Sequence, residues 1–175
     1  MPTSSSTPWT SAKPPEPGPD DHLRGEGPLV VEYADLECHH CALAHLRLKE
    51  LPVRRMFRHF PVNSKHPRAR VLAHAAEAAG RQGRFWEMHD SLLEDQAHLD
   101  DPHLWQRVER LGLDLDRFEV DRRGEEVAAR VERDFKSGIR AGVTGTPALF
   151  IDGRMHREVP QDALLSSPRP LTGES

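Results

Sequence analysis

The sequence has only two cysteines among its 175 residues, no long apolar run and no strong excess of either charge. A membrane-spanning helix needs about 20 mostly apolar residues, and no stretch supplies them. The net charge of −4 is spread without blocks, so no basic surface for nucleic acid is expected. The first residues lack the basic and apolar segments of a secretory signal. We therefore expect a cytoplasmic protein, unless a signal has been removed, with neither membrane nor nucleic acid as a partner.

The two ends of the chain are poor in apolar residues. Residues 1–22 are rich in Pro, Ser and Thr, and residues 166–175 (SSPRPLTGES) are similar. Such segments bury too little apolar surface to offset the entropy lost on ordering. We predict a disordered tail over 1–22, one domain over 23–165 and a flexible tail over 166–175.

The two cysteines, Cys38 and Cys41, are separated by two histidines. A disulfide between them would close a loop of four residues, which stabilises a fold by only about 2 kcal/mol in the chain-entropy model. Such a bond is a poor structural crosslink. The spacing therefore favours a dithiol whose disulfide forms and breaks during function.

The residues around the cysteines indicate a strand followed by a helix. Residues 29–34 (LVVEYA) are apolar and partly β-branched, and residues 35–37 form a turn. Cys38 then begins a helix, whose N-terminal N–H groups and dipole stabilise a thiolate. Cys41, one turn later, is expected to face the core. His40, and to a lesser degree His39, are candidates to stabilise the Cys38 thiolate; the alternative is that both are solvated first-turn residues.

Metal binding is the competing interpretation of this pair. Thiolates and imidazoles are zinc ligands, but a structural zinc site usually needs a second closely spaced pair, and no second cysteine pair exists. We therefore expect neither a metal nor a cofactor. A non-catalytic module that binds a metal or a partner through Cys38–Cys41 remains the alternative to an enzyme.

A second marker lies far along the chain, in residues 143–153 (VTGTPALFIDG). Residues 148–151 are an apolar strand, and Asp152-Gly153 is a strong hairpin signal before a short returning strand over 154–156. Pro147 opens the strand after a glycine-containing loop. Taken alone, Pro147 would be trans, because only about 5–6% of X–Pro bonds are cis.

Four segments together resemble DsbA-like thioredoxin-fold proteins: VVEYADLECHHC, FRHFPV, GRQGRFWEMHDSLLEDQ and SGIRAGVTGTPALFIDGR. The resemblance implies a thiol–disulfide oxidoreductase. It also implies a cis Pro147 opposite the dithiol, with Thr146 presenting its backbone to an extended substrate. Glu37 stands where an acid also occurs in similar proteins, and is a candidate proton relay for Cys41; a solvated turn acid is the alternative.

The predicted fold class is α/β: a thioredoxin-like central mixed β-sheet flanked by helices, with an all-α insertion near residues 65–140. A strand over 53–60 precedes the insertion. The periodicity predicts helices over 67–80, 85–96, 101–111, 114–118 and 124–141. A short helix over 160–165 closes the chain, and its shortness suggests an exposed apolar surface and a homodimer.

The expected reaction is thiol–disulfide exchange with protein substrates, or with low-molecular-weight thiols. Cys38 is the nucleophile and Cys41 the resolving thiol. The direction stays open, because the histidines between the cysteines favour an oxidising disulfide whereas a cytoplasmic location favours reduction or isomerisation.

Overall fold

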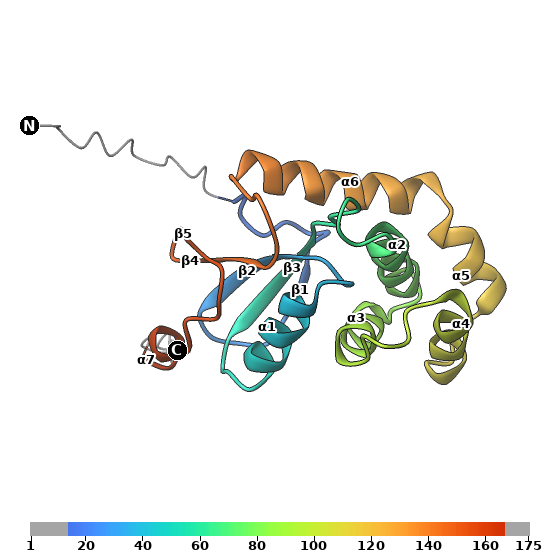
Figure 1. The fold of residues 1–175 in the computed structure, drawn as a ribbon, viewed down its shortest axis with the longest axis horizontal. Helices are drawn as coiled ribbons and strands as arrows, with labels where there is room; N and C mark the ends of the chain where they lie inside the picture. The colour runs from blue at the N-terminus through green and yellow to red at the C-terminus, as the bar shows by residue number, and fades with distance from the viewer. Residues whose placement is uncertain (1–13, 167–175) are drawn as a thin grey trace, which may run out of the picture.

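A five-stranded mixed β-sheet organises residues 14–166, the part of the chain described by this computed structural model (Figure 1). The strand order is β1-β3-β2-β4-β5, with β2 and β3 parallel and the other pairs antiparallel. The strands are β1 (His22–Arg24), β2 (Leu29–Ala34), β3 (Arg54–His59), β4 (Ala148–Ile151) and β5 (Arg154–His156). The mixed sheet flanked by helices is the predicted fold class.

Seven helices accompany the sheet in the described residues, and five of them form the insertion between β3 and β4. The helices are α1 (His39–Lys49), α2 (Ala69–Gly80), α3 (Phe85–Glu94), α4 (Asp101–Arg110), α5 (Leu115–Arg122), α6 (Glu125–Arg140) and α7 (Gln161–Ser166). The helix predicted over 114–118 is longer than expected and runs from Leu115 to Arg122. Asp114 caps its N-terminus by accepting a hydrogen bond from the Arg117 N–H.

The central strand β2 is buried on both faces, and its alternating side chains enter two different cores. Val30 packs with Leu48 of α1 and Leu164 of α7. Val31 packs on the opposite face with Phe150 of β4 and Ala141, which follows α6. Helices therefore cover both faces of the sheet, which fixes the position of the loop between β2 and α1.

Helix α6 lies close against the sheet because Gly138 carries no side chain. A Cβ at this position would lie 2.6 Å from a ring carbon of Phe60 and 3.0 Å from one of Tyr33. The close approach places the end of α6, and the loop that follows it, beside the sheet. This loop leads into β4 and carries the second sequence marker.

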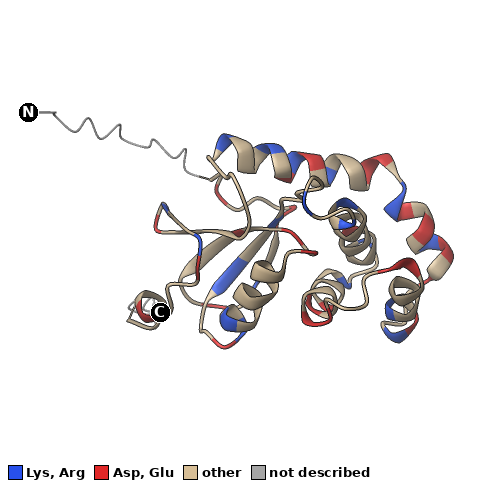
Figure 2. Ribbon diagram, in the orientation of Figure 1, with Lys and Arg blue, Asp and Glu red and all other residues tan. Residues whose placement is uncertain are grey.

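The charged residues are mixed rather than gathered on one helix face. Lys, Arg, Asp and Glu alternate along α5 and α6 (Figure 2). Within residues 14–166, every helix is too short or too polar to cross a bilayer.

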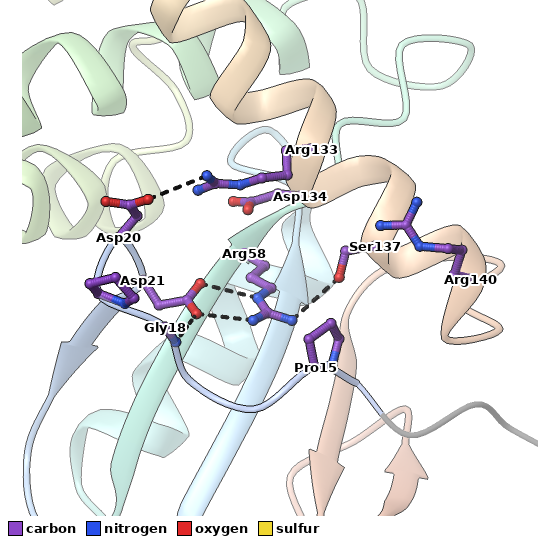
Figure 3. A pocket seen from close by; sticks show the side chains of 10 residues that line it. Pro15, Gly18, Asp20, Asp21, Arg58, Arg133, Asp134, Ser137 and Arg140 are labelled. Carbon is purple, nitrogen blue, oxygen red and sulfur yellow. Dashed lines mark hydrogen bonds and ion pairs between the residues drawn. The ribbon is translucent and has the colours of Figure 1, made fainter.

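The predicted N-terminal tail ends earlier than expected, because residues 21 and 22 belong to the folded domain. Asp21 accepts two hydrogen bonds from the buried Arg58 guanidinium, at 3.2 and 3.0 Å (Figure 3). His22 begins β1, a strand that was not predicted. The His22 ring stacks on the Phe85 ring, with 3.4 Å between the ring centroids. Buried partners elsewhere in the chain therefore order residues that look like linker in the sequence. Of the tails predicted over 1–22 and 166–175, residues 1–13 and 167–175 lie outside the described residues, and Ser166 ends α7.

Candidate active site

The two cysteines lie where β2 leads into α1, as predicted. Cys38 is the N-cap of α1, with extended backbone angles (φ −80°, ψ 121°), and Cys41 lies in the first turn. Both are free thiols, and they are 3% and 2% exposed. Cys41 packs in the core shared with the helical insertion, and Cys38 belongs to the same cluster. The dithiol therefore joins the sheet to the insertion.

The two thiols differ in acidity. A hydrogen bond from the Cys41 thiol lowers the pKa of Cys38 to about 5, against the opposing effect of burial, and the backbone N–H groups of Cys41 and His40 add to it. Burial, followed by the hydrogen bond and charge of Cys38, raises the pKa of Cys41 well above its ordinary value. At neutral pH the pair thus holds one thiolate, on Cys38, and one thiol, on Cys41. A thiolate attacks disulfides, so this asymmetry gives Cys38 the nucleophilic position.

The Thr146-Pro147 segment lies against the dithiol. The peptide bond between these residues is cis, and the Cys38 sulfur lies 3.7 Å from the Thr146 carbonyl oxygen. Cys38 and Thr146 are 108 positions apart in the sequence. The hairpin that follows has positive φ at both Asp152 and Gly153, as a type I′ turn requires, in agreement with the predicted hairpin.

The two histidines between the cysteines are exposed. The backbone N–H of His40 forms a hydrogen bond with the Cys38 sulfur, which lowers the pKa of Cys38. The two rings lie 6.3 Å from one another. His39 lines a hollow of about 460 Å³ together with Glu37, Arg68 and Leu99. An electrostatic role for either imidazole stays a prediction.

The Glu37 carboxylate binds the start of α2. It accepts a hydrogen bond of 2.6 Å from the backbone N–H of Arg68, the N-cap of α2. An acid at this place offsets the positive end of the helix dipole. Glu37 thus connects the active-site turn to the insertion, and a proton-relay role for it stays a prediction.

Asp35 is the acidic residue in contact with Cys41, and sequence reasoning treated it only as part of the turn. Its backbone N–H donates to the Cys41 sulfur at 3.5 Å. Its buried carboxylate accepts from the Glu37 and Val62 N–H groups, both at 2.9 Å, and contacts His66 Nδ1 at 2.8 Å. Asp35 therefore fixes the turn that carries the dithiol. A short acidic residue directly after an apolar strand was the available signal, because such residues often bind nearby backbone N–H groups.

A second buried acid, Glu32 of β2, pairs with Arg55 of β3 at 2.7 and 2.8 Å. Arg55 also contacts His45 Nδ1 of α1 at 3.2 Å. Burial opposes the Glu32 charge, but Arg55 holds the pKa of Glu32 below its ordinary value. The pair therefore ties the two parallel central strands to the helix that begins at the dithiol.

Close to this pair, His45, His89 and Asp90 bring possible metal-ligating atoms within 4.8 Å of one another. Both oxygens of Asp90 already bind the Arg24 guanidinium at 2.8 Å, and His45 Nε2 contacts Glu94 at 2.9 Å. His89 Nδ1 contacts Asp90 at 2.8 Å. Because Arg24 and Glu94 occupy the Asp90 oxygens and His45 Nε2, we interpret the group as a network of polar side chains.

The fold and the dithiol define a thioredoxin-like protein with a helical insertion. The family model described as "DSBA-like thioredoxin domain" matches residues 56–166, and the chain belongs to this family. Among solved structures, it is similar to a thioredoxin-like oxidoreductase from Silicibacter pomeroyi, with 25% identity, 85% of this chain and 90% of that chain covered, and a TM-score of 0.75. DsbA2 from Pseudomonas aeruginosa is 26% identical, with 86% and 93% covered and a TM-score of 0.66.

Protein relatives of higher identity bear a different name. The chain is 47% identical over 147 residues to the Na(+)/H(+) antiporter NhaA 3 of Salinispora tropica, a match that covers 78% of this chain and 22% of the antiporter. The antiporter NhaA of Herminiimonas arsenicoxydans is 38% identical, with 78% and 23% covered. The chain thus spans about a fifth of the length of these relatives.

Proposed function

We propose that the protein exchanges disulfides with protein substrates through Cys38 and Cys41. The observation that carries the proposal is the acidity difference between the two thiols at the N-terminus of α1. With a reduced pair, the Cys38 thiolate attacks a substrate disulfide, forms a mixed disulfide and releases one substrate thiolate. The Cys41 thiol then loses its proton and attacks the Cys38 sulfur. This step releases the second substrate thiolate and leaves the Cys38–Cys41 disulfide.

Substrate binding is proposed at the Thr146-Pro147 segment. The Thr146 carbonyl oxygen, 3.7 Å from the Cys38 sulfur, would accept a hydrogen bond from the backbone of an extended peptide. Main-chain pairing of this kind gives affinity with little dependence on sequence. It suits a protein that meets cysteines in many contexts.

The redox potential of the pair is expected to lie above that of thioredoxin, which is about −270 mV. A Cys38 pKa of about 5 stabilises the reduced form at neutral pH, so the disulfide becomes a better oxidant. Equilibration with glutathione buffers, followed by alkylation and mass spectrometry, measures the potential. Alongside it, catalysed reduction of insulin tests turnover. A potential at or below that of thioredoxin contradicts the acidity argument. Stoichiometric zinc binding that raises the melting temperature, with no turnover, favours the binding-module alternative.

A cytoplasmic location is part of the proposal. In a cytosol kept reducing by glutathione the pair would stand reduced, and exchange would begin with attack of Cys38 on a substrate disulfide. Cell fractionation combined with alkylation of free thiols tests this point. Recovery of the protein outside the cytoplasm, with Cys38 and Cys41 oxidised, would contradict both the location and the direction.

Self-association is proposed from the short closing helix. Helix α7 has six residues and leaves Leu165 58% exposed, while Leu43 and Leu46 of α1 are 42% and 47% exposed. Exposed apolar side chains are a common basis for protein contacts when they form one patch. Sedimentation equilibrium is expected to show a dimer at micromolar concentrations. A monomer throughout the accessible concentration range rules the dimer out.

A further inference from the structure

Arg157, just after β5, lies against the backbone of the loop that carries Thr146 and Pro147. Its Nη2 group donates a hydrogen bond to the Thr144 hydroxyl at 2.9 Å. A Cβ added to Gly145 would lie 3.0 Å from Arg157 Nη1, so the guanidinium occupies the space that a side chain would fill. The charge is thereby held beside the residue that precedes Thr146.

The guanidinium retains unused hydrogen-bond donors. An arginine side chain has five N–H donors, and among residues 14–166 the bond to Thr144 is the one that Arg157 makes. Arg24 and Arg58 each hold an aspartate, whereas within the described residues Arg157 has no carboxylate in ion-pair range. Its side chain is exposed, as is that of its neighbour Glu158. A fixed, solvent-accessible arginine with free donors is suited to a carboxylate.

The position of Arg157 relative to Cys38 determines which residue of a substrate peptide could carry that carboxylate. The Cys38 sulfur lies 3.7 Å from the Thr146 carbonyl oxygen, and Arg157 binds Thr144 and lies beside Gly145, the two residues before Thr146. An extended peptide advances about 3.3 Å per residue. If a peptide whose cysteine reacts at Cys38 runs along this loop in extended form, a side chain within two positions of that cysteine would reach Arg157.

We propose that Arg157 is a specificity residue that binds a carboxylate in the substrate, and that the protein favours acidic peptide segments next to the reacting cysteine. The inference rests on the proposed function and names its substrate class. A solvent-exposed ion pair has a modest effect, so the expected preference is about two- to fivefold in the rate constant for reaction with the peptide. It should weaken as ionic strength rises.

Two-cysteine peptides with identical sequence around both cysteines test the inference. Glu, Gln or Lys is placed at each position within two residues of the cysteines, and the rate constant for oxidation of the reduced protein by the disulfide form of each peptide is measured by acid quench and mass spectrometry. The wild type should prefer Glu to Gln on one side of the cysteine. Arg157→Gln should remove this preference and Arg157→Lys should keep part of it. Arg154→Gln, an exposed arginine of the same hairpin, is the matched control and should change nothing.

The Gln peptide separates the two possible failures. An equal Glu-to-Gln ratio in the wild type and Arg157→Gln, with the Gln peptide still reacting, overturns the inference and leaves the proposed function standing. Charge dependence confined to the disulfide of a small thiol dicarboxylate, with none among the peptides, also overturns it. Failure of every peptide to react overturns the proposed function, and the inference with it.

Discussion

Cys38→Ser is expected to lower the rate of thiol–disulfide exchange on the order of a thousandfold or more, because it removes the attacking sulfur. Reduction of insulin by dithiothreitol, with and without the protein, measures the catalysed rate. Cys38 is the N-cap residue of α1, a position that favours serine, so the variant should fold. Its circular dichroism and melting temperature provide that control. Catalysis that survives in a folded Cys38→Ser variant would show that another group is the nucleophile.

The pH dependence of the wild type gives an independent check on the same residue. Attack requires the thiolate, and the pKa of Cys38 is about 5. The rate constant for reaction of the reduced protein with a small disulfide should be nearly flat near pH 7 and fall below about pH 5. Thiolate absorbance near 240 nm should show the same midpoint. Cys41→Ala removes the main hydrogen bond to the Cys38 sulfur, so it should move the midpoint upward.

Arg55→Met is expected to destabilise the fold by about 3–5 kcal/mol, because it leaves the buried Glu32 carboxylate without its partner. Urea unfolding at pH 7 measures the loss. Arg54→Met is the matched control: Arg54 is the neighbouring residue of β3 and is exposed, so its replacement should change stability by less than about 0.5 kcal/mol. Equal effects of the two substitutions would contradict the importance of the buried pair.

The loss in Arg55→Met should depend on pH in one direction. The pKa of Glu32 is lowered in the folded state from an ordinary value of 4.5. A carboxyl group whose pKa is lowered by folding stabilises the folded state at pH values above its unfolded-state pKa. This stabilisation is lost as the pH falls through its folded-state pKa. The difference between the wild type and Arg55→Met should therefore be largest above about pH 5 and shrink in more acidic solution. A difference that grows as the pH falls would assign the effect to another group.

Local signals were enough to predict the dithiol and its setting. The apolar strand before Cys38, the helical spacing after it and the Asp152-Gly153 turn all depend on residues close together in the chain, and the structure contains each of them. The position of Thr146-Pro147 beside Cys38 came from the family resemblance, because no local pattern relates residues 108 positions apart.

What the sequence did not reveal depends on distant partners. The sequence alone indicates only that Asp35 lies in a turn. The structure shows that its carboxylate binds the Val62 N–H and the His66 ring. Glu32 and Arg55 read as charged residues within two apolar strands, and only the parallel pairing of β2 and β3 brings them together. The contact of Arg157 with Thr144 likewise forms only when the hairpin folds back beside the loop. Each contact joins residues whose types alone do not identify the pairing.

The central claim is that Cys38 attacks and Cys41 resolves, and mapping a trapped mixed disulfide tests it most directly. Cys41→Ala is reduced, mixed with a disulfide-containing protein substrate, quenched with acid and digested for mass spectrometry. The two-cysteine arrangement predicts a lasting disulfide between Cys38 and a substrate cysteine, and none in Cys38→Ser/Cys41→Ala. In the complementary variant Cys38→Ser, Cys41 should trap little substrate, because burial still keeps its pKa high and leaves little thiolate. A Cys41 adduct that forms as fast as the Cys38 adduct would contradict the assignment of the two roles.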